Sequence, residues 1–459
     1  MPVTRTTPRF MSHSGPSLLA ALALLALPVA GVALAGQSDG EQGAIAYAST
    51  APTDAVARLQ RDLDEGRTTL EFDPKHGYLP SVLSHLHVPV SSQGLVFSRT
   101  SLQVDHIAPW APRAVYFNDD VYVGWVQGGP IMEVADADPK LGGVFYTLEQ
   151  QPGEHPKFER QTSTCLQCHD SSSITGGVPG FILRSVFPDR YGYVITPIGE
   201  GPTTDRTPID QRWGGWYVTG TLGGQPNMGN TFAPLLVHEV DNVKRTLAAA
   251  REASTADVTD LKGRVSTKPY LSASSDAVAL MVLAHQSHVH NLITIANYEE
   301  RKAAYDRQLL QQSSSDSAAA DDQLDLRVRT AAERLLRGLL FSKEAPLAGP
   351  IAGTTRFASD FAGLGPRDHR GRSLRDFDLK TRLFRYPLSY LIYSESFNAL
   401  PAPVKSYVYR RLREVLTGAD TSEDFAGLSA SDREAILQIL DDTKPDFAGS
   451  KTTVEPAGR

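Results

Sequence analysis

The sequence predicts a mixed fold, in which a loop-rich region with some β-structure is followed by a mainly α-helical region. Over residues 71–240, short apolar segments alternate with glycine and proline, a pattern typical of strands joined by turns. Over residues 241–459, apolar residues recur instead at every third or fourth position, which is the period of a helix. Residues 36–70 begin with a polar stretch and predict a tether ahead of both regions.

Residues 1–35 predict a signal peptide. Arg5 and Arg9 precede an apolar run that ends at Ala35 in Ala-Leu-Ala, the pattern after which signal peptidase cleaves. The run is long enough to span a bilayer, but Pro28 interrupts it and no basic cluster follows. We therefore expect a periplasmic or otherwise exported protein, with membrane contact only if this segment is retained as an anchor.

The charge of the chain limits its partners. The 459 residues carry a formal net charge of −7, and cleavage after Ala35 would remove two arginines and no acidic residue, which changes the charge to −9. An acidic surface disfavours nucleic acid and anionic lipid as partners. The length is sufficient for two domains.

Three strands are predicted in the loop-rich region. The segments 115–117 and 121–123 flank the turn residues Asn118-Asp119-Asp120, which predicts a β-hairpin, and the segment 144–148 predicts a further strand. Aromatic residues of this region are expected in the core, with the alternative that some line a cofactor pocket. They are Tyr116, Phe117, Tyr122, Trp125, Phe145 and Tyr146.

Both cysteines of the chain lie in one short segment, Cys165-Leu166-Gln167-Cys168-His169. This spacing is that of covalent haem attachment, in which two thiols add to the vinyl groups of the porphyrin and the histidine binds the iron. The sequence therefore predicts one haem c per chain, attached through Cys165 and Cys168, with His169 as an iron ligand.

Three other interpretations of the cysteine pair are open. A thioredoxin-type redox pair is expected at the start of a helix in a βαβ unit, whereas polar residues flank this motif and no βαβ pattern surrounds it. A structural zinc site commonly uses more cysteine than this chain contains. A disulfide between the two cysteines would close too small a loop to stabilise the fold much.

The motif resembles that of the c-type cytochromes, which implies electron transfer with a redox partner protein. In class I cytochromes c, a proline near the tenth position after the ligand histidine accepts a hydrogen bond from the histidine ring, and Pro179 is ten residues beyond His169. Pro179 also suits an ordinary glycine-rich turn. A loop methionine is the sixth iron ligand in that family, and Met228 lies at a similar distance along the chain, without the proline that usually follows it.

Arg212 and Trp213 are candidates for binding the haem propionates. They lie in a glycine-rich segment that contains two of the four tryptophans. Propionates need hydrogen-bond donors when they are partly buried, and guanidinium and indole N–H groups are such donors. The alternative is a packed turn in which the arginine stem lies along apolar surface.

The second region predicts helices over residues 242–253, 276–312, 323–341, 379–395, 404–416 and 428–440, with a low-complexity connector near 313–322. In the second helix, His285 and His288 lie on the apolar face. Since buried rings need partners, either both bond within the core or one reaches the haem from the distal side, as sixth ligand or as acid-base group. A separate metal site is a further alternative, although no carboxylate accompanies them on that face. The sixth ligand is therefore Met228, His285, His288 or none of them.

Two functions of different classes follow. In the first, the protein is an exported electron carrier with one six-coordinate haem c. In the second, it is a haem enzyme such as a peroxidase or an oxygenase, with an open distal site and His285 or His288 as acid-base catalyst. The length favours the enzyme, whereas the single haem favours the carrier, because the c-type peroxidases and oxygenases generally carry a second haem.

Overall fold

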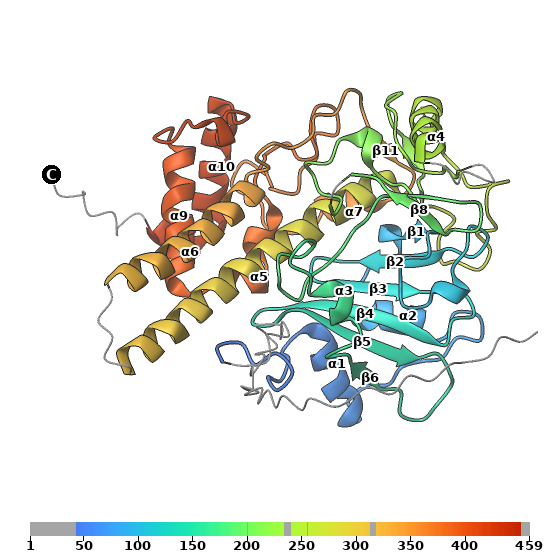
Figure 1. The fold of residues 1–459 in the computed structure, drawn as a ribbon, viewed down its shortest axis with the longest axis horizontal. Coiled ribbons are helices and arrows are strands. Elements are labelled where there is room, and N and C mark those ends of the chain that lie inside the picture. Colours follow the sequence, from blue (N-terminus) through green and yellow to red (C-terminus); the bar gives the residue numbers. More distant parts are fainter. Residues whose placement is uncertain (1–42, 200, 234–239, 255, 313–317, 451–459) are drawn as a thin grey trace, which may run out of the picture. The chain divides into compact units, whose positions relative to one another are not determined.

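A seven-stranded antiparallel sheet is the main β-structure of the computed structural model, which describes residues 43–199, 201–233, 240–254, 256–312 and 318–450 (Figure 1). Its strand order is β6-β5-β4-β3-β2-β1-β9, and two small sheets pair β7 with β8 and β10 with β11. The strands are β1 Gly94–Val96, β2 Arg113–Phe117, β3 Val121–Trp125, β4 Ile131–Asp138, β5 Gly142–Glu149, β6 Phe158–Arg160, β7 Val186–Pro188, β8 Val194–Pro197, β9 Trp216–Tyr217, β10 Gly220–Thr221 and β11 Ala352–Gly353. The predicted hairpin and the predicted third strand are confirmed as β2, β3 and β5.

The two faces of the large sheet differ in exposure, because successive side chains of a strand point to opposite sides. The inner face, which includes Tyr116, Val134 and Tyr146, is buried. We call the opposite side the outer face. Its residues come from two rows of directly opposed positions in β2, β3, β4 and β5, namely Val115, Gly124, Glu133 and Thr147 in one row and Phe117, Tyr122, Ala135 and Phe145 in the other.

The exposure also changes along the outer face itself. The row that contains Phe117, Tyr122 and Phe145 is mostly buried, whereas Val115, Glu133 and Thr147 of the other row are half-buried. The outer face therefore has a covered part and a more open part.

Residues 36–70 do not form the predicted tether where the structure describes them. Tyr47 is 1% exposed and belongs to the core, and α1 (Ala55–Asp64) follows it. Asp54 caps the first turn of this helix, and Asp136 of β4 accepts from two further N–H groups of that turn. Since these N–H groups have no partner within the helix, the carboxylates fix the segment to the sheet. The polar composition of the segment predicted a tether and gave no indication of this packing.

One long helix, α5 (Ala277–Gln312), packs against β5 of the sheet and against α6 (Ala318–Leu339) (Figure 1). Its bounds agree with the prediction for residues 276–312. The side chain of Asp276 caps the helix by accepting from the N–H groups of Val278 and Ala279. Through α5, residues of the predicted helical region, 241–459, contact the sheet that contains the predicted strands.

The remaining helices agree with a largely helical second region, with one exception. No α-helix spans the range 379–395, which contains a 3-10 helix over Tyr390–Tyr393 and, at its end, the first residue of α8 (Glu395–Asn398). Pro387 has no N–H to donate, and Leu379 has a φ of 55°, a conformation that regular helices exclude. The other helices are α2 Leu79–His85, α3 Leu166–His169, α4 Val240–Ala253, α7 Phe357–Ala362, α8 Glu395–Asn398, α9 Ala402–Leu416, α10 Ala430–Thr443 and α11 Pro445–Gly449, with short 3-10 turns at Val90–Ser92, Val104–His106, Ile209–Gln211 and Glu423–Phe425.

Apolar side chains of the sheet and of α5, α6, α9 and α10 form one continuous core. A second, smaller cluster contains Phe187, Ile198, Met228 and Ala233. The predicted mixed fold is confirmed at this level, while the division into two regions near residue 240 stays a prediction.

Three predicted segments lie wholly or partly outside the described residues: the signal peptide at 1–35, residues 36–42 of the tether and residues 313–317 of the connector. The remaining connector residues, 318–322, belong to α6. Among the helices that the structure does describe, none combines the length and the apolar composition needed to cross a bilayer.

Candidate functional site

The cysteines and the histidine of the motif lie on one helical turn, in which Cys165 is the N-cap of α3 (Leu166–His169). The N–H groups of Cys168 and His169 both donate to the carbonyl of Cys165, over 3.2 and 3.0 Å. Cys165 is half-buried, Cys168 is exposed, and both are free thiols. Burial, together with the carboxylate of Glu133, raises the pKa of Cys165 to about 11. Since a reactive redox cysteine needs a lowered pKa, this environment disfavours a thioredoxin-type pair.

His169 is held so that one ring nitrogen remains available. Its Nδ1 lies 2.8 Å from the carbonyl oxygen of Gly180, and since a carbonyl oxygen can only accept, Nδ1 carries the proton. Burial lowers the pKa of the ring, which favours the neutral form. In that form Nε2 presents its lone pair, which is the donor that binds iron.

The carbonyl group expected from Pro179 is supplied by the next residue. The carbonyl of Pro179 accepts instead from the N–H of Gly143 in β5, over 2.8 Å, while the N–H of Gly180 donates to the carbonyl of His169, over 2.9 Å. Pro179 therefore bonds to the sheet, and Gly180 bonds to His169. Because the sheet occupies the carbonyl of Pro179, the ring N–H of His169 donates to the carbonyl of Gly180 instead.

Asn291 of α5 fixes the same turn, although no sequence pattern singles it out. Its side-chain amide accepts from the N–H of Phe181 and donates to the carbonyl of Phe181, both over 2.8 Å. The asparagine is 6% exposed, and a buried amide needs such partners. A polar residue on the buried face of a helix indicates that it needs a hydrogen-bond partner. The partner, Phe181, lies 110 residues away in the sequence, so a local pattern does not predict this contact.

Aromatic side chains cover the other side of the histidine. The ring of Phe145 lies 4.5 Å from that of His169, and Phe181 lies 6.4 Å from Phe145. The ring of His290 is 5.6 Å from Phe181, and its Nε2 donates to the carbonyl of Asp119 over 2.8 Å. Part of the predicted aromatic core therefore contacts the motif histidine directly.

No protein-family model, curated protein or solved structure matches this chain. The motif and the geometry around His169 are consequently the basis of any functional assignment.

Arg212 and Trp213 are both buried, with 2% of each exposed. The guanidinium of Arg212 donates to the carbonyls of Thr207 and Asp205, over 2.6 and 2.7 Å, and burial lowers its pKa to about 10. The indole N–H of Trp213 has no hydrogen-bond partner among the residues that the structure describes. The guanidinium of Arg212 is already hydrogen-bonded to carbonyls of the preceding loop. This favours the packed-turn alternative for Arg212 over a role in propionate binding.

Met228 lies in the small apolar cluster with Phe187, Ile198 and Ala233 and has no exposed surface. Its N–H donates to the carbonyl of Arg212 over 2.9 Å. Apolar packing in this cluster accounts for the burial of the Met228 side chain. Its role as sixth iron ligand stays a prediction.

Met228→Ala should lower the free energy of unfolding by about 2–5 kcal/mol, because it leaves a cavity in a closed apolar cluster. Met228→Leu should cost less than about 1.5 kcal/mol, since it conserves volume. Urea denaturation measures both values. We expect the ferric absorption spectrum of the haem-loaded protein to be the same in the two variants, and loss of a sulfur-to-iron charge-transfer band in Met228→Ala alone would show instead that Met228 is an iron ligand.

His285 has no exposed surface and is bonded at both ring nitrogens. Its Nε2 lies 2.8 Å from Oγ of Ser389, and its Nδ1 lies 3.4 Å from Oδ1 of Asp205. Phe341 stacks on the ring at 4.0 Å. His288 is half-buried, and burial lowers its pKa to about 4. These contacts favour the interpretation that His285 is bonded within the core.

Ser389, His285 and Asp205 occur in the order of a hydrolytic triad. Ser389 and His285 have no exposed surface, and Asp205 is 2% exposed. A nucleophile must reach its substrate, so this buried array stabilises the core and carries no assignment of hydrolysis.

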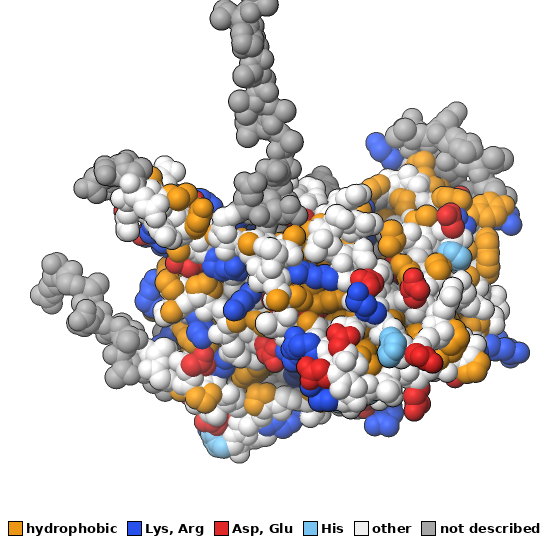
Figure 2. Space-filling view, turned by 90° about the horizontal axis from the view of Figure 1, so that it is seen from below, with side chains coloured by type: hydrophobic (Ala, Val, Ile, Leu, Met, Phe, Trp, Pro, Cys, Tyr) orange, Lys and Arg blue, Asp and Glu red, His pale blue; other side chains and the backbone are white. Residues whose placement is uncertain are grey.

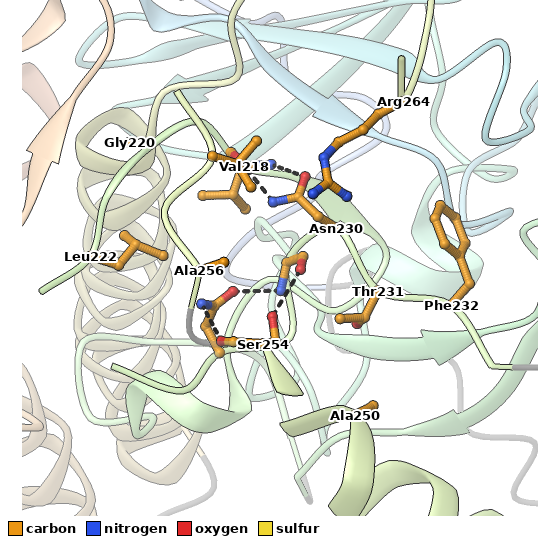
Figure 3. Close-up of a pocket in the computed structure, with 13 residues that line it drawn as sticks. Val218, Gly220, Leu222, Asn230, Thr231, Phe232, Ala250, Ser254, Ala256 and Arg264 are labelled. Atoms are coloured by element: carbon orange, nitrogen blue, oxygen red, sulfur yellow. Dashed lines mark hydrogen bonds between the residues drawn. The ribbon is translucent and has the colours of Figure 1, made fainter. Parts of the chain in front are cut away.

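A pocket of about 280 Å³ is lined by residues of the 218–232 segment and of the 250–264 segment (Figure 3). Its amide groups are already bonded: Asn230 accepts from the N–H of Val218 and donates to its carbonyl, over 3.1 and 3.0 Å. Asn227 accepts from the N–H of Gly229 over 2.9 Å. The pocket includes no residue of the motif, and its bonded amide groups indicate no particular ligand.

A group of Asp368, His369 and Asp442 places its potential ligand atoms within 4.8 Å of one another. Both oxygens of Asp368 already accept hydrogen bonds from Arg372, including one from Nε over 2.7 Å. The ring of His369 bonds to Asp442 at an exposed position. Hydrogen bonding within the group accounts for this arrangement without a metal ion.

Proposed function

We propose that the chain binds one haem c covalently through Cys165 and Cys168, with His169 as an iron ligand, and that it takes part in electron transfer as an exported protein. The observation that supports this most strongly is the bond from Nδ1 of His169 to the carbonyl of Gly180. This bond fixes the tautomer in which Nε2 is free to bind a metal. The loop-rich part of the mixed fold is then the haem region, as the resemblance to c-type cytochromes implies.

The residues at the motif fit a covalently held haem. Haem iron supplies one-electron transfer between its ferric and ferrous states. The turn of α3 presents both thiols within four residues, one half-buried and one exposed. The carbonyl of Gly180 keeps the proton on Nδ1 of His169, and the ring of Phe145 limits the rotation of the imidazole. The chain itself thus sets the orientation and the basicity of the ligand nitrogen.

An exported location and a redox partner protein are parts of this proposal. The signal-like residues 1–35 support the location, because covalent haem is added to c-type cytochromes outside the cytoplasmic membrane. The face drawn in Figure 2 has acidic, basic and apolar side chains interspersed, which disfavours that face as a binding site for a polyanion such as nucleic acid. The N-terminal sequence of the secreted protein should begin near Gly36, and an intact N-terminus in washed membranes would indicate an anchor instead.

A haem enzyme with an open distal site is the second candidate. The observation in its favour is that Met228 and His285 are each committed to contacts elsewhere in the core. These contacts favour an iron that takes neither of these two side chains as its sixth ligand. A peroxidase or an oxygenase needs such an open position.

Absorption spectra of the purified protein test the proposal. Reduction followed by reoxidation should change the haem bands reversibly, and a protein without redox-dependent bands would contradict the proposed function. Carbon monoxide then separates the two candidates, because it binds ferrous iron only where a coordination position is free. An unchanged spectrum supports the carrier, and a shifted one supports the open site.

A further inference from the structure

The peptide group that orients His169 is hydrogen-bonded at both of its ends. The carbonyl of Gly180, which accepts from Nδ1 of His169, and the N–H of Phe181 belong to one peptide unit. That N–H donates to Oδ1 of Asn291 over 2.8 Å. A continuous chain of hydrogen bonds therefore runs from the side chain of Asn291 in α5, through a single peptide group, to the ring of His169.

Phe181 also fixes which way the amide of Asn291 faces. Its Nδ2 donates to the carbonyl of Phe181 over 2.8 Å, so Oδ1 is the atom that faces the N–H of the same residue. An exchange of the two amide atoms would set donor against donor and acceptor against acceptor. Asn291 thus acts on the N–H of Phe181 only as an acceptor.

The absence of a side chain at Gly180 permits this approach from the helix. A Cβ atom on Gly180 would overlap Oδ1 of Asn291. The backbone conformation does not itself require glycine here, because the φ of Gly180 lies outside the left-handed region. From the sheet, a Cβ atom on Gly143 of β5 would lie 3.2 Å from the nitrogen of Gly180. The peptide group is therefore in close contact with both α5 and β5.

This chain of bonds is shielded from water. Asn291 and Phe181 are each 6% exposed, and Gly180 is buried. In such surroundings, hydrogen bonds that are linked through a peptide group polarise and strengthen one another. The bond to Asn291 therefore makes the carbonyl of Gly180 a stronger acceptor. A stronger acceptor for the N–H at Nδ1 of His169 makes its Nε2 more basic.

An ion pair of the sheet supplies opposing charges near the ring. Arg113 of β2 reaches Glu133 of β4 across Gly124, where a Cβ atom would overlap the guanidinium. Burial is the main cause of the lowered pKa of His169, and the bond to Gly180 opposes it. Of the two charges, Arg113 lowers this pKa further and Glu133 raises it. Both charges remain when Asn291 is changed, so they do not produce a difference between variants at that position.

We propose that Asn291 is a positioning residue that lowers the reduction potential of an iron bound at His169, acting through the Gly180–Phe181 peptide group. A more basic ligand nitrogen stabilises the ferric ion, which carries one more positive charge than the ferrous ion. Loss of the acceptor on Asn291 therefore favours reduction. The proposal rests on the covalent haem of the proposed function and adds to it a residue that controls the potential.

Redox titration of the haem-loaded protein tests this assignment. Asn291→Leu removes the acceptor with little change in side-chain size. At a fixed ambient potential the ferrous-to-ferric ratio should rise about 3- to 10-fold, which corresponds to a potential about 30–60 mV higher for one electron. A loosened turn predicts the opposite sign, because water that enters stabilises the more highly charged ferric ion. A potential equal to that of the parent, or below it, would overturn the inference.

Asn291→Asp should shift the potential in the other direction. Its carboxylate is a stronger acceptor for the N–H of Phe181 and adds a negative charge, so the ferrous-to-ferric ratio should fall about 3- to 10-fold. The comparison is made at about pH 9, above the range to which burial usually raises the pKa of a carboxyl group. This variant keeps the test decisive if Asn291→Leu does not fold, and an unchanged or higher potential would contradict the inference.

The matched control is Asn297→Leu on the same helix. Asn297 is 4% exposed, and its Nδ2 donates to the carbonyl of Pro139 over 3.3 Å, so the change removes a buried amide that bonds to a different segment. The potential should stay at the parent value, and a rise as large as that of Asn291→Leu would overturn the inference. Each of these results leaves the proposed function in place, whereas a chain that retains no haem would overturn the proposed function itself.

Discussion

Cys165→Ser combined with Cys168→Ser should reduce the haem that stays with the denatured chain at least about tenfold, because no thiol remains to form a thioether bond. Either single variant should retain a haem held by one bond, with a shifted absorption maximum. Both thiols are free and lie on one turn, so the substitution changes no disulfide. Haem absorbance of the denatured protein gives the measurement.

His169→Ala differs from the cysteine variants in its expected effect. The thioether bonds should still form, but the iron loses the nitrogen that the Gly180 carbonyl orients. The ferric and ferrous spectra should change, while His155→Ala, at an exposed position, should leave them as in the parent. Identical spectra for His169→Ala and the parent would remove His169 from the site.

The second large effect is expected at His285. His285→Ala should lower the free energy of unfolding by about 3–5 kcal/mol, because it leaves the carboxylate of Asp205 buried and unpaired. Burial alone would raise the pKa of Asp205, but the hydrogen bond and the charge of His285 outweigh it and lower that pKa to about 2. Since the folded-state pKa is lowered, this stabilisation is present above about pH 4 and is lost as the pH falls toward 2. Urea denaturation at several pH values measures the effect.

His288→Ala is the matched control on the same helix. Its Nε2 has no hydrogen-bond partner among the described residues, and the ring is half-buried, so its loss should cost about 1 kcal/mol. Neither substitution should alter the haem spectrum. A spectral change in His285→Ala at full haem content would return this histidine to the distal side of the iron.

Local patterns were sufficient for much of the fold. The long helix α5 and the hairpin of β2 and β3 follow from periodicity and turn residues within short windows. The packing of Tyr47 and the capping of α1 by Asp136 were not predictable in this way. Tyr47 donates to the carbonyl of Gly143 in β5, 96 residues further along the chain, and Asp136 of β4 lies about 80 residues beyond the start of α1.

The candidate site shows the same limit. The motif Cys165–His169 is local and is read directly from the sequence. The pairing of Arg113 with Glu133 depends on the register of three strands and on the absence of a side chain at Gly124. Sequence distance alone selected Met228, whereas its apolar neighbours decide its position. Long-range contacts therefore determine every part of the site beyond the motif itself.

The most direct test of covalent haem attachment is acid-acetone extraction of the purified chain, followed by the intact mass of the denatured polypeptide. The haem should remain with the polypeptide, and the mass should equal that of the chain plus one haem. If the haem enters the acetone phase and the chain carries unmodified Cys165 and Cys168, the assignment is wrong.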